Sequence, residues 1–313
     1  MSAAPSLDRL RQSLSNVTWR ETLGKGTGVV VPLNDQGARI PFFCVHSLTG
    51  KATDYVPLAQ KLGPDQPFFS IQIPPANRSP DYAGLIAPLS IPAIATHYID
   101  AIAALRPTGP IALGGWSIGA IIALEMAQQL KARDREVALL VVIDMIPWNT
   151  AFPPASRVFR MIDTALQSPA WLAAHKLVRN GVRFRALGER ARLKLAALTA
   201  KLRGRPVPPK EEMVGDLVDI AKYAAPHLAL MEQMFASAQT YMPQPYDGAV
   251  QVYAARADVA LDHLARLRWG WRHIAPQSRV TAMPGAHQTL FNGQDGDRLA
   301  AHLAQHLAAL GAA

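Results

Sequence analysis

Short apolar runs alternate with longer segments of helical spacing through the first half of the chain. The short runs are rich in β-branched and aromatic residues, which favour strands. The segments between them carry apolar residues three or four positions apart, the periodicity of an amphipathic helix. This pattern predicts strands at 28–33, 40–46, 66–73, 111–116 and 137–144, and helices at 54–62, 91–105 and 118–131. Strands that alternate with helices in this way indicate an α/β fold with a mostly parallel sheet covered on both faces.

The pattern changes after Pro147. About a hundred residues follow with helical periodicity and without a strand candidate. Strand signals return at 248–255 and 278–283, and an amphipathic helix is predicted from about Asp297 to Leu310. Because the sheet pattern resumes, we expect one α/β domain with an insertion rather than two independent domains. The predicted division is an N-terminal extension over 1–26, a core over 27–147 and 247–313, and a helical insertion over 148–246.

Composition narrows the class of protein. Half of the 313 residues are hydrophobic, which is enough for a sizeable core and excludes a disordered chain. The single cysteine excludes an internal disulfide and a cysteine-rich metal site, and we expect neither a metal nor a resident cofactor. The N-terminus meets charge before any apolar stretch, unlike a signal peptide, and the longest apolar run, around 138–146, is too short to span a membrane. We therefore expect a soluble, cytoplasmic protein.

The net charge of +9 is concentrated in one segment. Residues 151–210 hold thirteen Lys and Arg but only two acids, Asp163 and Glu189, so the rest of the chain carries −2. An electrostatic partner should therefore dock on this segment. A protein that binds nucleic acid or an anionic membrane surface is one interpretation. Against it, the sequence has no recognised nucleic-acid motif, and aromatic residues are sparse in the basic run.

The pentapeptide Gly115-Trp-Ser-Ile-Gly119 lies directly between a predicted strand and a predicted helix. In that setting G-x-S-x-G is the pattern of a nucleophile elbow, whose glycines allow a sharp turn that lifts the serine hydroxyl above the edge of the sheet. The free N–H groups and the positive dipole end of the next helix face the reacting group. A serine that only caps the helix is the alternative. We predict Ser117 as a catalytic nucleophile.

A serine hydroxyl needs a base to take its proton, and the base needs a carboxylate to orient it. In hydrolases with such an elbow the chain order is serine, acid, histidine. Of the nine histidines, His287 alone follows the last strand in a glycine-containing loop, so we predict it as the base. His302 and His306 are expected on a solvated helix face. Surface or packing positions are expected for His97, His175, His227, His263 and His273.

Two acids compete for the orienting role. Asp144 ends the strand that follows the elbow helix, and an acid there faces the same rim of the sheet as Ser117. Asp258 follows the next strand, where many hydrolases of this fold keep their acid. The residues alone leave the two at near parity.

The oxyanion of an acyl transfer needs backbone N–H donors. One is expected from Ile118, the residue after the nucleophile. The second is expected from the loop His46-Ser-Leu-Thr-Gly50, whose small residues allow the backbone to approach a substrate closely. We favour Leu48 for this second donor, with Ser47 as the alternative. Cys44, in the preceding strand, is expected to be a buried core thiol.

Taken together, these residues resemble the thioesterase domains that end nonribosomal peptide and polyketide synthases, which have the α/β-hydrolase fold. The resemblance is dense over 40–149 and thin over 250–291. The matching pieces are Pro41-Phe-Phe-Cys-Val-His46 with Gly50, Ser90-Ile91 through Ala95 and Tyr98, Arg106-Pro-Thr-Gly-Pro110, Leu113-Gly-Gly-Trp-Ser-Ile-Gly119, Glu125-Met-Ala127 with Leu130, Val142-Ile-Asp144, and Pro284-Gly285 with His287.

This resemblance implies a thioesterase that releases an acyl or peptidyl chain from a phosphopantetheinyl carrier protein, by hydrolysis or cyclisation. It favours Asp144 as the acid, because the family commonly places the acid after the strand that follows the elbow helix. Asp258 stays open, because some stand-alone editing relatives use the later strand. The resemblance also implies that residues 148–246 form a helical lid over the acyl chain. The basic run of this lid suits an acidic carrier protein, and equally a solvated helix face.

Two positions depart from the family pattern. The loop at 46–50 reads His-Ser-Leu-Thr-Gly, where the family usually starts with His-Pro or His-Gly and ends with Gly-Gly. Ala120 stands where a second glycine often follows the elbow. Both bear on the geometry of the oxyanion hole rather than on the chemistry. A carboxylester hydrolase or an acyltransferase to an alcohol or amine, built on the same triad, is the alternative function. The oligomeric state is left open.

Overall fold

A seven-stranded sheet forms the centre of the molecule, in a computed structural model that describes residues 28–74, 89–147, 161–162, 165–166, 225–256 and 263–311. The strand order is β1-β3-β2-β4-β5-β6-β7, with β1 antiparallel to β3 and the other neighbours parallel. The strands are β1 (Val30–Asn34), β2 (Phe42–Val45), β3 (Phe68–Ile71), β4 (Ile111–Trp116), β5 (Val137–Ile143), β6 (Val250–Ala255) and β7 (Arg279–Met283).

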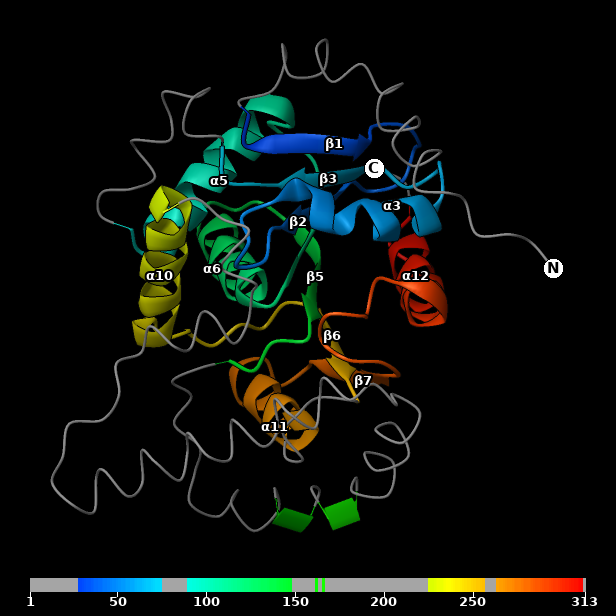
Figure 1. Ribbon diagram of the computed structural model, residues 1–313. Coiled ribbons are helices and arrows are strands. Elements are labelled where there is room, and N and C mark those ends of the chain that lie inside the picture. Colours follow the sequence, from blue (N-terminus) through cyan, green and yellow to red (C-terminus); the bar gives the residue numbers. More distant parts are fainter. Residues whose placement is uncertain are drawn as a thin grey trace, which may run out of the picture.

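Helices cover both faces of this sheet. One face carries α5 (Ile91–Leu105), α6 (Ile118–Ala132), α10 (Ala225–Thr240) and α11 (His263–Ile274). The other carries α3 (Val56–Leu62), which follows a 3₁₀ turn at Ala52–Tyr55, and α12 (Gly293–Ala308). Figure 1 shows α5, α6 and α10 on one side of the strands and α3 with α12 on the other. This covering confirms the α/β fold with a mostly parallel sheet flanked by helices that the sequence predicts.

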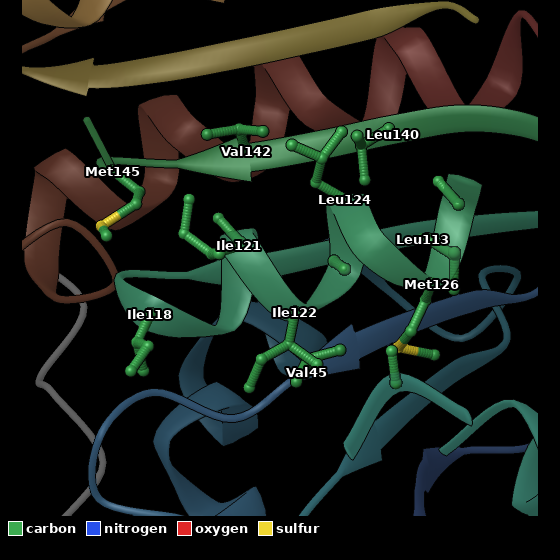
Figure 2. Close-up of a cluster of buried hydrophobic side chains, with 14 of the residues drawn as sticks. Val45, Leu113, Ile118, Ile121, Ile122, Leu124, Met126, Leu140, Val142 and Met145 are labelled. Carbon is green, nitrogen blue, oxygen red and sulfur yellow. The ribbon is translucent and has the colours of Figure 1, made fainter. Parts of the chain in front are cut away.

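Helix α6 lies in the centre of the larger core. Nearly every side chain in its first turns is buried, so the helix is apolar all round, as expected of a helix enclosed by other elements. In Figure 2, Ile121 and Leu124 of α6 lie beneath Val142 and Leu140 of β5, while Ile122 faces Val45 of β2. This packing anchors the residues at the start of α6, where the elbow lies.

The predicted elements agree with the structure where the apolar pattern is unbroken. Strand β4 and helix α5 have the predicted bounds, and the Ser90 hydroxyl caps α5 by accepting the Ala93 amide at 3.3 Å. Helix α12 begins at Gly293, four residues before the predicted start. Helix α11 was not predicted. Its apolar positions have helical spacing, but arginines separate them, and the stretch lies between two strands.

The predicted division into extension, core and lid stays a prediction. The extension over 1–26, residues 75–88 of the core and most of the lid lie outside the described residues. Of the predicted lid, helix α10 is described, and its Met231, Met234 and Phe235 are buried in the larger core. No helix in the described ranges is long and apolar enough to cross a membrane.

Candidate active site

The carboxyl ends of the parallel strands meet at one edge of the sheet, and the predicted site residues follow them. Ser117 comes directly after β4, Asp144 directly after β5, and His287 lies in the loop after β7. The loop at 46–50 follows β2, which pairs with β4. In an open parallel sheet this edge is where ligands bind.

Ser117 forms the predicted elbow. Its backbone has φ 58° and ψ −133°, a combination that costs a residue with a side chain of the order of 1–3 kcal/mol and that the surroundings must hold. The two glycines of the motif provide the space for it. A Cβ on Gly115 would lie 2.2 Å from the carbonyl of Gly119, and a Cβ on Gly119 would lie 2.3 Å from the carbonyl oxygen of His46. The strained turn therefore requires glycine at both positions.

Tyr55 ties the elbow to the neighbouring strand. Its hydroxyl donates to the carbonyl of Val45 at 2.5 Å and accepts the amide of Trp116 at 2.9 Å. The ring is fully buried, and burial raises the pKa of its hydroxyl well above the usual value, so the group stays a neutral donor. This bridge fixes the distance between the end of β2 and the residue before Ser117.

Asp144 is buried and makes three hydrogen bonds through its carboxylate. Oδ2 accepts from Nδ1 of His287 at 2.7 Å, and Oδ1 accepts from Nε2 of His263 at 2.8 Å and from the amide of Ala255 at 2.7 Å. Burial alone would raise the pKa of Asp144, but the hydrogen bonds from the two histidines outweigh it and hold the pKa well below its usual range. The carboxylate is therefore ionised and acts only as an acceptor.

His287 contacts this carboxylate and the ring of Trp116, the residue before Ser117. Its side chain is 25% exposed, and its ring lies 5.0 Å, centre to centre, from that of Trp116, the neighbour of Ser117. Because Nδ1 donates to Asp144, the neutral ring has Nε2 free of hydrogen as an acceptor. This is the tautomer that a general base needs, while among the described residues no hydrogen bond joins Nε2 to the hydroxyl of Ser117.

The loop after β2 packs against the start of α6 through backbone contacts at Gly119. Leu48 and Ile118, the two predicted oxyanion donors, are both buried. Within the described part of the chain, neither of their amides donates to a protein acceptor. Buried N–H groups of this kind suit an oxygen that arrives with a ligand.

Side chains help to hold this loop in place. Asp54 Oδ2 accepts from the hydroxyls of Ser47 at 2.9 Å and Thr49 at 2.5 Å. His227 of α10 donates from Nε2 to the carbonyl of Thr49 at 2.9 Å. These hydrogen bonds restrict the conformation of the loop at Ser47 and Thr49.

The structure describes only some of the other residues that the sequence analysis singled out. Asp258, the alternative acid, and the basic residues of 151–210 lie outside the described residues. Cys44 is buried as predicted. His306 is half-buried with its ring 4.9 Å, centre to centre, from that of His302, so the expectation of a solvated face was wrong for both histidines, and most clearly for His302. This ring is half-buried and bonded through Nδ1 to the Tyr253 hydroxyl at 3.2 Å, because α12 packs on the sheet at that point.

His263 is the residue of the site that sequence reasoning missed. It is buried at the start of α11 and contacts Asp144, 119 positions away. The available signal was the helical spacing of Leu264, Leu267 and Trp271, which would have identified α11 and placed His263 at its first turn. Among the described residues, no group of three or more His, Cys, Asp or Glu side chains is arranged to hold a metal ion.

Comparison with known proteins identifies the family. The family model of the thioesterase domain matches residues 40–307. The chain belongs to the thioesterase domain family. This agrees with the resemblance seen in the sequence, and the expectation of a thioesterase-type hydrolase is confirmed at the level of the family.

Relatives of this thioesterase domain are parts of much larger synthases. The chain is 33% identical over 144 residues to chondramide synthase cmdD of Chondromyces crocatus, covering 46% of this chain and 4% of that protein. It is 35% identical over 113 residues to the non-reducing polyketide synthase curS2 of Aspergillus terreus, covering 34% of this chain and 5% of that protein. The chain thus spans about a twentieth of the length of these relatives.

A solved structure has the same fold. The thioesterase domain of NocB, in covalent complex with a fluorophosphonate analogue of nocardicin G, superposes with a TM-score of 0.57 at 24% identity. The match covers 89% of this chain and 99% of that one. The likeness establishes the fold of this thioesterase domain as that of the solved one.

Proposed function

We propose that this thioesterase domain releases an acyl or peptidyl chain from a phosphopantetheinyl carrier protein by serine catalysis. Ser117 is the nucleophile, His287 the base and Asp144 the acid that orients it. The observation that carries the proposal is the bond between Asp144 Oδ2 and His287 Nδ1 at the sheet edge where the strained Ser117 turn lies.

The chemistry follows from the protonation of these groups. Ser117 Oγ attacks the thioester carbonyl while Nε2 of His287 accepts its proton, and Asp144 stabilises the imidazolium. The amides of Ile118 and Leu48 bond the tetrahedral oxyanion, with Ser47 as the alternative second donor. The carbon–sulfur bond then breaks, the thiol leaves with the proton from His287, and the chain remains as an ester of Ser117.

A second nucleophile completes the turnover. Water attacks the ester carbonyl, His287 takes its proton, and Ser117 leaves as the alcohol with that proton, which releases a free acid. An amine or hydroxyl of the bound chain, attacking in place of water, releases a lactam or lactone. These steps use only groups of this chain and the phosphopantetheine of the substrate, and need neither a metal nor a resident cofactor.

The carrier partner is inferred from the relatives, which include a dimodular nonribosomal peptide synthase of Bacillus subtilis and the polyketide synthase curS2. A carrier protein delivers the chain as a phosphopantetheine thioester, and we assign the reaction to the cytoplasm. The basic segment at 151–210 remains our candidate for the docking surface. An acidic carrier would be attracted to it, and the attraction would weaken with salt.

The proposal is tested by labelling with a fluorophosphonate probe, followed by mapping of the modified residue by mass spectrometry. Modification of Ser117 is expected, and Ser117→Ala and His287→Ala should lower kcat for an acyl thioester by at least roughly a thousandfold. His273→Ala, at an exposed position on α11, is the control and should keep activity. Near-normal cleavage by a folded Ser117→Ala variant would exclude this mechanism.

The same triad would serve a carboxylester hydrolase or an acyltransferase. A panel of matched thioester and oxyester substrates, each assayed with and without an acceptor alcohol or amine, separates these functions. We expect the highest kcat/KM with thioesters and release of a free acid or a cyclic product. Preference for oxyesters, or a product joined to the added acceptor, would assign the alternative function instead.

A further inference from the structure

The carboxylate of Asp144 is shared between two histidines from different parts of the chain. His287 bonds Oδ2, and His263 bonds Oδ1 together with the amide of Ala255. We propose that His263 is a positioning residue that orients the Asp144 carboxylate and tunes the basicity of His287. This inference rests on the proposed function, because it assigns His287 as the base.

Orientation is the first part of the argument. The torsion that rotates a carboxylate about its Cβ–Cγ bond is broad, so an isolated aspartate does not hold one oxygen in a fixed direction. Here two donors bind Oδ1, one from α11 and one from β6. With Oδ1 held in this way, Oδ2 alone is directed at His287, and the ring keeps the tautomer in which Nε2 can accept a proton.

Charge is the second part. A donor on Oδ1 disperses part of the negative charge that stabilises an imidazolium at His287. Removing that donor should concentrate the charge on Oδ2 and raise the pKa of His287. The groups around the His287 ring in the described structure are Asp144 at the end of β5, the uncharged ring of Trp116 from β4, and His263 across the carboxylate. A further charged group is Asp295 of α12. Its Oδ2 lies 2.4 Å from the place that a Cβ on Gly285 would take, and Gly285 is two residues before His287 in the chain.

Helix α11 is built to hold His263 in place. The ring of His263 is buried at the first turn, and Leu264, Leu267 and Trp271 are buried in the larger core. Trp271 also donates from Nε1 to the carbonyl of Met145 at 2.6 Å, immediately after Asp144. The helix therefore contacts the Asp144 turn through two side chains, one on the carboxylate and one on the following backbone.

Two substitutions at one position test the proposal. His263→Leu removes the donor, whereas His263→Gln keeps an amide N–H at about the reach of Nε2 but cannot carry a charge. We expect His263→Leu to lower kcat roughly ten- to hundredfold with KM within about threefold of the wild type, and His263→Gln to restore kcat to within about threefold. His273→Leu, on the exposed face of the same helix, is the matched control.

The pH profile distinguishes positioning from a purely structural role. His287 must be neutral to accept a proton, so activity falls as the pH drops below its pKa. If removal of the Oδ1 donor raises that pKa, the acid limb of kcat/KM should move to higher pH in His263→Leu and not in His273→Leu. Loss of thermal stability with an unchanged acid limb and an unchanged kcat would overturn the proposal, as would a His263→Gln variant as slow as His263→Leu.

A measurement without turnover separates this proposal from the proposed function. NMR titration of the His287 ring should give a higher pKa in His263→Leu than in the wild type, even if no thioester is cleaved. A shifted pKa with no wild-type activity would remove the proposed function and leave the positioning role. An unchanged pKa of His287 in an active enzyme would keep the proposed function and remove the positioning role of His263. If His263→Leu does not fold, His263→Asn serves in its place, because its amide falls short of Asp144.

Discussion

At the scale of single residues, the elbow combines two glycines that allow close approach of the backbone with one strained serine. Neither Gly115 nor Gly119 is needed for a positive φ, because both are required by backbone atoms that approach where a Cβ would lie. The positive φ belongs to Ser117, which has a side chain. The strain therefore lies at the proposed reacting residue, and close packing of the flanking glycines holds it there.

Replacing Gly119 by alanine tests this account. The added Cβ would lie 2.3 and 2.4 Å from the carbonyl oxygens of His46 and Val45, and backbone atoms cannot move aside as a flexible side chain can. We expect the free energy of unfolding to fall by roughly 2–4 kcal/mol and kcat to fall as well, because the loop at 46–50 is displaced from Ile118. Denaturant unfolding and steady-state kinetics measure the two effects.

The control for this substitution is Gly63→Ala. Gly63 has φ +82°, but no atom lies within 4 Å of the place that a Cβ would take, so alanine there meets strain without a collision. Because φ 82° and ψ 176° lie in a region essentially restricted to glycine, we expect a loss of roughly 1–3 kcal/mol, with kcat unchanged. Equal effects of the two substitutions would show that close approach at Gly119 is not what the fold requires.

At the scale of elements, the loop between β2 and α3 is held by side chains in addition to the backbone bond from the Gly50 amide to the Ser47 carbonyl. Asp54 accepts from Ser47 and Thr49, and His227 binds the Thr49 carbonyl from α10. One part of the loop thus bonds to the 3₁₀ turn that follows it, and another to a helix of the predicted lid segment. The position of Leu48 depends on both contacts.

Removing the Asp54 carboxylate should therefore affect catalysis more than binding. In Asp54→Ala both hydroxyls lose an ionised acceptor, and the loop that carries the second oxyanion donor becomes free to shift. We expect kcat to fall roughly tenfold with a smaller change in KM. Asp54→Asn keeps an acceptor oxygen, so its kcat should lie between that of Asp54→Ala and that of the wild type.

The exposed Asp65→Ala provides the matched control for Asp54, and should leave both kinetic constants unchanged. Circular dichroism establishes that each variant is folded before kinetics are compared. A folded Asp54→Ala enzyme with wild-type kcat would mean that the loop keeps its position without this carboxylate.

At the scale of the whole molecule, the site is assembled next to a buried neutral histidine. His46 is fully buried, and its Nδ1 donates to the carbonyl of Ser47 while Nε2 accepts from the Tyr98 hydroxyl. Burial, together with the nearby His227, lowers the pKa of His46 from 6.5 to about 4, against the opposing effect of the Ser47 carbonyl. The folded protein therefore keeps this ring neutral where the unfolded chain would protonate it.

This difference predicts how stability depends on pH. Between pH 6.5 and 4 the unfolded chain binds a proton at His46 that the folded chain does not. Lowering the pH through this range should therefore reduce the free energy of unfolding, by up to about 3 kcal/mol from this ring. Asp144 acts in a lower window, because its pKa is depressed and its contribution is lost only as the pH falls below about 4.

Chemical denaturation across that pH range measures the slope. His46→Gln removes the titrating ring and should flatten the dependence between pH 6.5 and 4, whereas the exposed His273→Gln should leave it as in the wild type. The same slope in His46→Gln and the wild type would contradict the assignment. An NMR titration of His46 in the folded wild type, expected to show no protonation above about pH 5, checks the pKa directly.

The class of the fold, the position of the elbow and the loop that holds His287 could be predicted from the amino-acid sequence. Each of these depends on local information. Periodicity reports which face of a segment is buried, and G-x-S-x-G encodes a contact between residues four positions apart. The same local logic failed at α11, where arginines interrupt the apolar pattern of a helix that packs on the core.

The groups that bond to Asp144 could be identified only in the folded chain. Its partners Ala255, His263 and His287 are 111, 119 and 143 positions away along the chain. No periodicity or motif encodes contacts at such separations. They arise because the parallel strands bring their carboxyl ends to one edge of the sheet, and because α11 packs so that its first residue points into that edge. The sequence left two acids at near parity, and the contact with His287 came from the folding of the sheet.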